Sequence, residues 1–329
     1  MLTAPMLAKY GFAKEPLEAG WFEDESFSFL LESIQELVRK GRLIVVTGAM
    51  GVGKTSSLSR ISKQLESEKE IVVSVAYSVE KQKVSLQSLM LALILDLRPD
   101  DPSVILKAKQ PEQRERTLRG ILTESRKNIA MFVDEAHDLS LQTLVELKRL
   151  MEICKIGASS LSIILVGHPR LRHVLKQSEE TQEIGDRAFF HEMRGITGRE
   201  QEFFEWMMKQ CLLDGVSIKD VFTNDAVEFI VTTFSTPLQM QCFVGRAIEE
   251  AWEMGQKPIS LSVLQEAVFR DLQNKESRLV RMGYNSKRLA EYLNVREIEV
   301  RTYFGGKLPS DRHKEIEDKI SKLGLLARA

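Results

Sequence analysis

The octapeptide at residues 48–55, GAMGVGKT, constrains the fold of this chain more than any other segment. It follows the apolar run at 43–46 and precedes an amphipathic stretch, which predicts a strand, a glycine-rich turn and a helix start. Glycines let successive backbone N–H groups converge on phosphate oxygens, and the helix N-terminus adds partial positive charge. The segment therefore predicts a phosphate-binding loop, although an ordinary glycine-rich turn fits the bare pattern. The residues expected to hold the nucleotide are Gly48, Gly51, Val52, Gly53, Lys54, Thr55 and Ser56.

A second motif, IAMFVDEAH at 129–137, is an apolar strand that ends in two adjacent carboxylates. The carboxyl ends of parallel strands form the ligand crevice of an open α/β sheet. There Lys54 would reach the β- and γ-phosphates, while Thr55 and Asp134 would hold Mg²⁺. Glu135 would orient or deprotonate the attacking water. The alternative is that both acids merely cap a helix beginning near Leu139.

Composition limits the class of protein. The chain has 329 residues, 43% of them hydrophobic and 28% charged, which suggests two or three soluble domains. The net charge of −1 does not indicate a nucleic-acid partner, so a surface that binds nucleic acid would have to be a local basic patch. Cys154, Cys211 and Cys242 are scattered and lack metal-type spacing, as expected for reduced core residues. The apolar runs are strand-sized, so a cytoplasmic protein without membrane insertion is expected.

Strand and helix patterns alternate in the first part of the chain, which predicts a parallel sheet covered by helices on both faces. After about residue 195 the strand patterns stop and helical patterns continue. Strands are expected at 43–46, 71–77, 129–133 and 161–166, and helices at 55–65, 85–97, 141–153, 200–213, 223–234, 237–254 and 260–272. The predicted domains are an α/β nucleotide-binding domain at 1–195, a helical lid at 196–275 and a basic helical tail at 276–329.

The tail at 276–329 is basic, because Lys and Arg outnumber Asp and Glu there. Residues 286–295 and 298–306 have the helix, short turn and helix pattern of a helix-turn-helix. Ala290 is the small residue expected where the helices cross, and Asn294 takes the turn position where glycine is common. A three-helix accessory bundle with ordinary solvated charges remains the alternative.

Together the two phosphate motifs, the helical lid and the strand end at 163–169 resemble the AAA+ ATPases. More narrowly, the chain resembles the ATPase regulators of bacterial DNA transposition, the TnsC, TniB, IstB and MuB group, and their ExeA-type relatives. The resemblance covers about residues 8 to 270. It implies an AAA+ P-loop parallel sheet domain with a helical lid and a small all-α C-terminal domain. Supporting matches are YGF at 10–12, FVDEAH at 132–137, LVGHPRL at 165–171 and TPLQ at 236–239.

The resemblance also implies roles for two further catalytic residues. His168 matches sensor 1, a polar residue between the phosphate motifs that contacts the γ-phosphate or the attacking water; a histidine bonding a loop carbonyl is the alternative. Arg187 matches the arginine that reaches the γ-phosphate of the neighbouring subunit. Arg194 and Arg199 are rivals for that role, and a surface salt bridge is the alternative for Arg187.

The lid departs from the family pattern at one position. Many relatives carry an arginine just after the lid proline, where it serves as sensor 2, but Leu238 follows Pro237 here. Either Arg246, about two turns further along the same helix, substitutes for it, or the lid senses nucleotide weakly. Slow hydrolysis that suits a timer or switch is therefore expected.

The function implied by the resemblance is an ATP- and Mg²⁺-dependent transposition regulator. It would oligomerise as a ring or filament on duplex DNA, mark a target site and recruit a transposase. A target-selection protein or a guide-RNA complex would be a further partner. ATP hydrolysis would release the assembly from DNA. The alternatives are a nucleotide-gated protein-interaction switch with little turnover, and a secretion ATPase like the ExeA relatives. The candidate DNA contacts are Lys81, Lys83, Lys107, Lys109, Arg114 and Arg116. The alternative is that these cations belong to an ordinary solvated helix whose charge is balanced by Glu112 and Glu115.

Overall fold

The computed structural model of the chain separates into two compact units. The α/β unit comprises Asp24–Gly48 and Lys54–Met193, and the helical unit comprises Met1–Glu23, Ala49–Gly53 and Arg194–Ala329. Within the part of the chain that is described, no helix is long and apolar enough to cross a membrane. The structure describes residues 2–23, 25–68, 70–75, 85–101, 104, 110–125, 127–156, 159–177, 181–273, 279, 284–304, 308–309, 312, 315–316 and 319–320.

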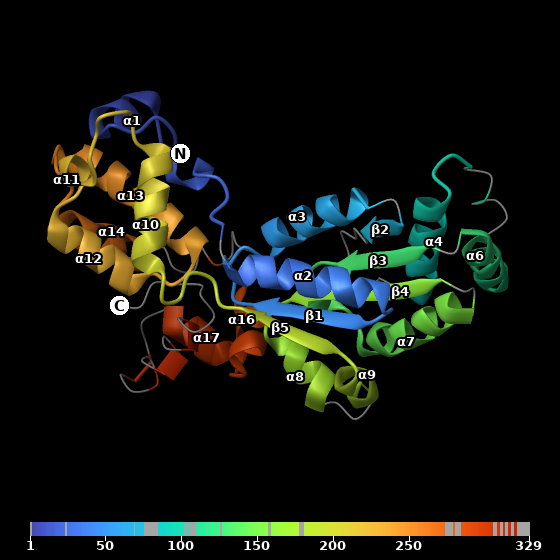
Figure 1. Cartoon of the computed structure of the whole chain (residues 1–329). Helices are drawn as coiled ribbons and strands as arrows, with labels where there is room; N and C mark the ends of the chain where they lie inside the picture. Colours follow the sequence, from blue (N-terminus) through green and yellow to red (C-terminus); the bar gives the residue numbers. More distant parts are fainter. Residues whose placement is uncertain are drawn as a thin grey trace. The chain divides into compact units, whose positions relative to one another are not determined.

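A five-stranded sheet in the order β2-β3-β4-β1-β5 forms the centre of the α/β unit (Figure 1). Every neighbouring pair is parallel, with β4 between the strands that carry the two phosphate motifs. The predicted α/β fold with a parallel sheet and following helices is thus confirmed. The strands are β1 (Leu43–Gly48), β2 (Ile71–Val75), β3 (Asn128–Val133), β4 (Ser160–Gly167) and β5 (Phe189–Met193).

Alternate residues of the strands are buried against helices on opposite faces, which is why the strands read as continuous apolar runs. Ile44 and Val46 pack with α2 and α3, whereas Leu43 and Val45 pack with the helices of the other face. Figure 1 shows α2 and α3 lying together along one face. The helices of this unit are α2 (Glu25–Arg39), α3 (Lys54–Glu66), α4 (Leu86–Leu97), α6 (Pro111–Ser125), α7 (Leu141–Ile156), α8 (Arg170–Gln177) and α9 (Gln182–Asp186), with the short η3 (Ala136–Asp138).

The helical unit has its own aromatic-rich core, built from Phe203, Phe204, Phe243 and neighbouring side chains. The amino-terminal segment belongs to this core, although the sequence placed residues 1–195 together. Tyr10 is fully buried and its hydroxyl donates to the Gln256 carbonyl at 2.8 Å. The elements are α1 (Ala4–Tyr10), η1 (Pro16–Glu18), α10 (Glu200–Cys211), α11 (Ile218–Val221), α12 (Asn224–Thr233), α13 (Pro237–Met254) and α14 (Leu261–Gln273).

Two short helices of the tail, α16 (Ser286–Leu293) and α17 (Glu297–Phe304), pack around a separate small core. Asn294 caps α16 in the left-handed conformation, with φ 53° and ψ 52°. Ala290, predicted to lie where the helices cross, is buried and belongs to this small core. The first turn of α17 carries Glu297 and Glu299, so its amino-terminal end is acidic. Use of this helix pair for DNA binding stays a prediction.

Candidate nucleotide-binding site

The phosphate-binding loop connects β1, which ends at Gly48, to α3, which begins at Lys54. The Lys54 ammonium donates a hydrogen bond to the Gly48 carbonyl at 2.9 Å, so its side chain folds back over the loop. Burial lowers the pKa of Lys54, while Glu135 and Asp134 act in the opposite direction. A cation held beside a glycine-rich turn at a helix N-terminus fits a polyphosphate.

Gly51 shows why the loop requires glycine. Its φ is +81°, a conformation that a residue with a side chain rarely adopts, and its carbonyl accepts a hydrogen bond from the Leu238 N–H at 3.3 Å. A Cβ placed on Gly51 would lie 2.8 Å from the Cβ of Leu238 and 3.1 Å from the Thr236 hydroxyl. The residue at the position expected for sensor 2 therefore packs on the loop backbone.

The two phosphate motifs meet at Thr55 and Asp134. The Thr55 hydroxyl donates to one Asp134 carboxylate oxygen at 3.0 Å, and the other oxygen accepts the Glu135 N–H at 2.8 Å. A hydroxyl and a carboxylate in contact are oxygen donors of the type that Mg²⁺ prefers. These side chains therefore fit the Mg²⁺ implied for the site.

Glu135 has a left-handed backbone, with φ 51° and ψ 38°, which is uncommon for a residue with a side chain. Its carboxylate is half exposed and lies 3.2 Å from Nδ1 of His137, whose side chain is only 8% exposed. Strained backbone of this kind concentrates at functional sites. Because Glu135 itself is the amino-terminal cap of the short η3 and makes no side-chain capping bond, capping does not explain its carboxylate.

His168 follows the end of β4, between the strands that carry the two motifs. Its backbone N–H donates to Nδ1 of His137 at 3.3 Å, and the two imidazole rings are 6.0 Å apart. Burial, followed by His137, Lys54 and Arg170, lowers the pKa of His168 to about 4, so its imidazole is neutral at pH 7. The Nδ1 atom of His168 accepts the Arg170 N–H at 3.3 Å.

His137 was not among the predicted site residues, although it lies between Glu135 and His168. A Cβ on Gly167 would lie 3.0 Å from His137 Nδ1, so this glycine allows the end of β4 to approach the imidazole. Burial lowers the pKa of His137 below its usual value, against the opposing effect of Glu135. The sequence offered one indication, the histidine that comes two residues after Glu135. The glycine that His137 approaches, Gly167, lies 30 residues further along the chain.

Arg187 lies far from the phosphate-binding loop of its own chain. It follows α9 and precedes β5, level with Arg42 because Ile44 pairs with Phe189. The six residues of β1 then separate it from Gly48 by about 20 Å. Its guanidinium is 68% exposed and pairs with Glu183 at 3.1 Å. Of the rivals, Arg194 is exposed, and Arg199 pairs with Glu202 at 2.7 Å and stacks on Phe22.

The remaining candidates are only partly described. Arg246 donates through Nε to the Cys242 carbonyl at 3.4 Å and lies over the Phe243 ring, both within the helical unit. Arg114 and Arg116 are on α6, where Arg116 is exposed. The other DNA-contact candidates, Lys81, Lys83, Lys107 and Lys109, lie outside the described residues.

The sheet order, the loop after β1 and the acidic pair after β3 define a P-loop protein of the AAA+ type. Residues 38–175, less than half of the chain, match the family model described as an AAA domain, and ATP binding is the property that this match indicates. No curated protein matches the chain.

Several solved structures share the fold at low sequence identity. The Aeropyrum pernix ORC1 protein, solved in complex with DNA, is 13% identical with a TM-score of 0.54, covering 95% of this chain and 88% of that one. The Cdc6p protein from Pyrobaculum aerophilum is 16% identical with a TM-score of 0.52, covering 93% and 81%. Drosophila ORC bound to DNA is 13% identical with a TM-score of 0.51, covering 97% and 78%.

Proposed function

We propose that this chain is an ATP-dependent, DNA-binding regulator of transposition that assembles on duplex DNA as rings or filaments. The assembly marks a target site and recruits a transposase, and ATP hydrolysis drives its disassembly. The observation that supports ATPase chemistry most strongly is the contact between Thr55 and Asp134, which brings the two phosphate motifs together. The transposition role rests on the sequence resemblance, and the transposase and a target-selection protein or guide-RNA complex are its proposed partners.

The proposed chemistry divides among five side chains. Lys54 binds the β- and γ-phosphates, and Thr55 and Asp134 hold the metal ion. When bound, Mg²⁺ neutralises phosphate charge. Glu135 orients or deprotonates the attacking water, and its half-exposed carboxylate is accessible for this. His168, neutral at pH 7, supplies a hydrogen bond near the γ-phosphate rather than a positive charge.

The proposed assembly follows from the place of Arg187. Because about 20 Å of strand separates it from the loop of its own chain, it can contact a γ-phosphate only on another copy. The ion pair between Arg187 and Glu183 is weak because both side chains are exposed, so Arg187 can exchange Glu183 for a phosphate. An arginine supplied in trans contributes about 10³–10⁵ in rate, which would make hydrolysis depend on assembly.

The DNA contacts are proposed to be mainly to phosphates, and therefore tolerant of sequence and sensitive to salt. Among the described candidates, the exposed Arg116 suits this role better than Arg114, which is partly buried. Two of the similar structures, Aeropyrum pernix ORC1 and Drosophila ORC, were solved with DNA, which is consistent with this proposal. The α16–α17 pair is a second proposed contact, to DNA or to the transposase. Deletion of residues 276–329 should reduce one of these interactions and leave ATP binding intact; retention of both would exclude this role.

Electron microscopy tests the proposal most directly. The purified protein is imaged with duplex DNA and a slowly hydrolysed ATP analogue, alongside samples with ADP and with Lys54→Ala. Rings or filaments on DNA that require both the triphosphate and Lys54 are expected. Single particles that ignore DNA in every nucleotide state would exclude assembly on DNA.

A nucleotide-gated interaction switch with little turnover is the second candidate, favoured by Leu238 at the sensor 2 position and its contact with Gly51. The Glu135→Gln variant separates the two candidates. A transposition regulator that disassembles by hydrolysis should become trapped on DNA by this change. A switch without turnover should behave like the unchanged protein.

A further inference from the structure

A pocket of about 540 Å³ opens at the amino-terminal edge of the sheet, at the opposite end of β1 from the phosphate-binding loop. It lies between the end of α2, the last turns of α7, and α9, and all of its lining belongs to the α/β unit. Its size falls within the range of small-molecule sites. Because about 20 Å of strand separates the two places, one mononucleotide cannot fill both.

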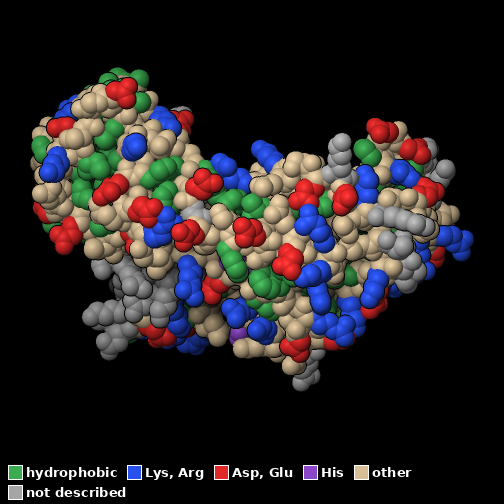
Figure 2. Space-filling model, in the orientation of Figure 1, with side chains coloured by type: hydrophobic (Ala, Val, Ile, Leu, Met, Phe, Trp, Pro, Cys, Tyr) green, Lys and Arg blue, Asp and Glu red, His purple; other side chains and the backbone are tan. Residues whose placement is uncertain are grey.

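The pocket lining is strongly cationic. Six Lys and Arg residues line it against two carboxylates, Glu152 and Glu183. Figure 2 shows Lys and Arg side chains close together over this edge of the sheet. The cations are Arg39, Lys40, Arg42, Lys148, Lys155 and Arg187.

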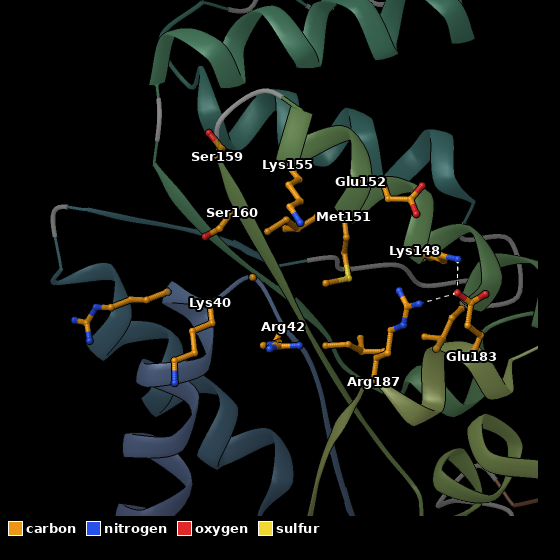
Figure 3. Close-up of a pocket in the computed structure, with 15 residues that line it drawn as sticks. Lys40, Arg42, Lys148, Met151, Glu152, Lys155, Ser159, Ser160, Glu183 and Arg187 are labelled. Carbon is orange, nitrogen blue, oxygen red and sulfur yellow. Dashed lines mark hydrogen bonds and ion pairs between the residues drawn. The ribbon is translucent and has the colours of Figure 1, made fainter.

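Ion pairs satisfy four of these cations. Arg39 pairs with Glu68 at 2.8 Å, Lys40 pairs with Glu36, and Lys148 and Arg187 share Glu183. Within the described part of the chain, neither the Arg42 guanidinium nor the Lys155 ammonium pairs with a carboxylate. Figure 3 shows Lys155 and Met151 projecting from α7 toward Arg42 and Arg187.

The ordinary explanation for such cations is that they neutralise helix C-termini. Each helix end carries about half a negative charge, so the ends of α2 and α7 account for about one cation. Lys155 in the last turn of α7 is explained in this way. Arg42 is not, because it stands outside any helix, between α2 and β1. A guanidinium there retains its full set of donors in the geometry that suits a phosphate.

The floor of the pocket is apolar. Leu43, Leu161 and Ile184 are buried beneath it, and Met151 is partly exposed at its wall. An apolar floor with a cationic rim suits an amphipathic anion better than a bare inorganic ion. A thioether also packs readily against a flat aromatic ring.

We propose that this pocket is a second ligand site, which binds a small phosphorylated molecule of the nucleotide class. Arg42, Lys155 and Arg187 contact its phosphates, and Met151 with the apolar floor contacts its base. The site is separate from the phosphate-binding loop and does not depend on the proposed role in transposition. Its occupant contacts Arg187, so binding here competes with any contact of Arg187 to another copy.

Isothermal titration of the full-length Lys54→Ala variant tests this proposal, because the loss of Lys54 weakens the first site. ADP and inorganic tripolyphosphate are titrated at physiological salt. One ADP should bind per chain, more tightly than tripolyphosphate. Adding Arg42→Ala and Lys155→Ala should weaken ADP binding about tenfold or more, while Lys209→Ala with Lys219→Ala, which removes two exposed cations from the helical unit, should change it less than about twofold.

The titration has clear contrary outcomes. Absence of ADP binding to Lys54→Ala would overturn the proposal, as would an affinity that ignores the Arg42 and Lys155 changes. Equal weakening by the Lys209 and Lys219 control would show general electrostatic attraction and would overturn it too. Circular dichroism checks that each variant is folded, and Arg42→Gln with Lys155→Gln repeats the test with polar side chains of similar length.

Discussion

The carboxylate of Glu135 lies 3.2 Å from Nδ1 of His137, and the same nitrogen accepts the backbone N–H of His168. A neutral imidazole that accepts the N–H at Nδ1 cannot also donate from that atom to the carboxylate. The present arrangement therefore leaves Glu135 without a strong bond to His137. The carboxylate that would activate water therefore lies beside His137 without accepting a hydrogen bond from its Nδ1 atom.

The backbone of Glu135 leads to the first prediction. At φ 51°, glycine avoids a steric cost of about 1–2 kcal/mol that alanine and glutamate bear. Glu135→Gly is therefore expected to be about 1 kcal/mol more stable than Glu135→Ala, with hydrolysis lost in both. Urea denaturation measures the difference. A more stable alanine variant, the usual order elsewhere in proteins, would show that the left-handed conformation is not maintained.

The second prediction concerns pH. The unfolded chain takes up a proton at His168 below about pH 6.5, whereas the folded chain does so only near pH 4. The folded state binds fewer protons in this window, so the free energy of unfolding should fall as the pH drops through it, by about 1.4 kcal/mol per pH unit from this group. His168→Gln should flatten the decline, measured by denaturation at several pH values. The exposed His173 provides the control, and an equal effect of His173→Gln would contradict the assignment.

The third prediction compares two loop glycines. Gly51 and Gly53 both have positive φ, at +81° and +96°, but only a Cβ on Gly51 would meet the lid residues, since nothing lies within 4 Å of one on Gly53. Gly51→Ala should therefore destabilise the protein by about 1–3 kcal/mol more than Gly53→Ala, measured without nucleotide. Leu238→Gly should recover part of the loss. Equal effects of the two alanines would mean that Leu238 does not pack on Gly51 in solution.

The fourth prediction tests whether Arg187 acts on another copy. Lys54→Ala and Arg187→Ala should each abolish hydrolysis alone. In an equal mixture about one quarter of the sites combine an intact Lys54 with a neighbour's intact Arg187, and activity should return to roughly that level. Lys54→Ala mixed with the double variant is the matched control and should stay inactive. A mixture without recovery would assign the arginine role elsewhere, with Arg194 as the next candidate.

The sequence predicted four strands of the sheet because each of them reads as an apolar run. The strands β2 and β5 both lie at sheet edges, but β5 was missed because it includes His191 and Glu192, which interrupt the apolar pattern. The contacts of the amino-terminal segment with the helical unit were not predicted, for a different reason. Its partner is distant in sequence, since Phe12 bridges to Leu212, and local periodicity does not report such contacts.

The candidate site likewise has residues that the sequence predicts and residues that it does not. Lys54, Thr55 and Asp134 follow fixed spacings on single elements, so the motifs locate them before the fold is known. The position of His137 between Glu135 and His168 depends on how closely the end of β4 approaches η3, which the glycine at 167 permits. The cationic pocket joins α2, α7 and α9, and α2 ends at Arg39 whereas α9 begins only at Gln182. No local pattern contains that juxtaposition.

Gly48 and Arg187 lie at opposite ends of paired strands, so an assembly in which each Arg187 meets the nucleotide site of the next copy in turn has a direction. Such a head-to-tail contact joins unlike surfaces, and it closes into a ring or extends as a filament. A filament of this kind has unequal ends, one showing a nucleotide site that no arginine completes and the other an arginine without a nucleotide. Growth and loss of subunits at the two ends would then respond differently to nucleotide, which would give the proposed assembly one orientation along DNA.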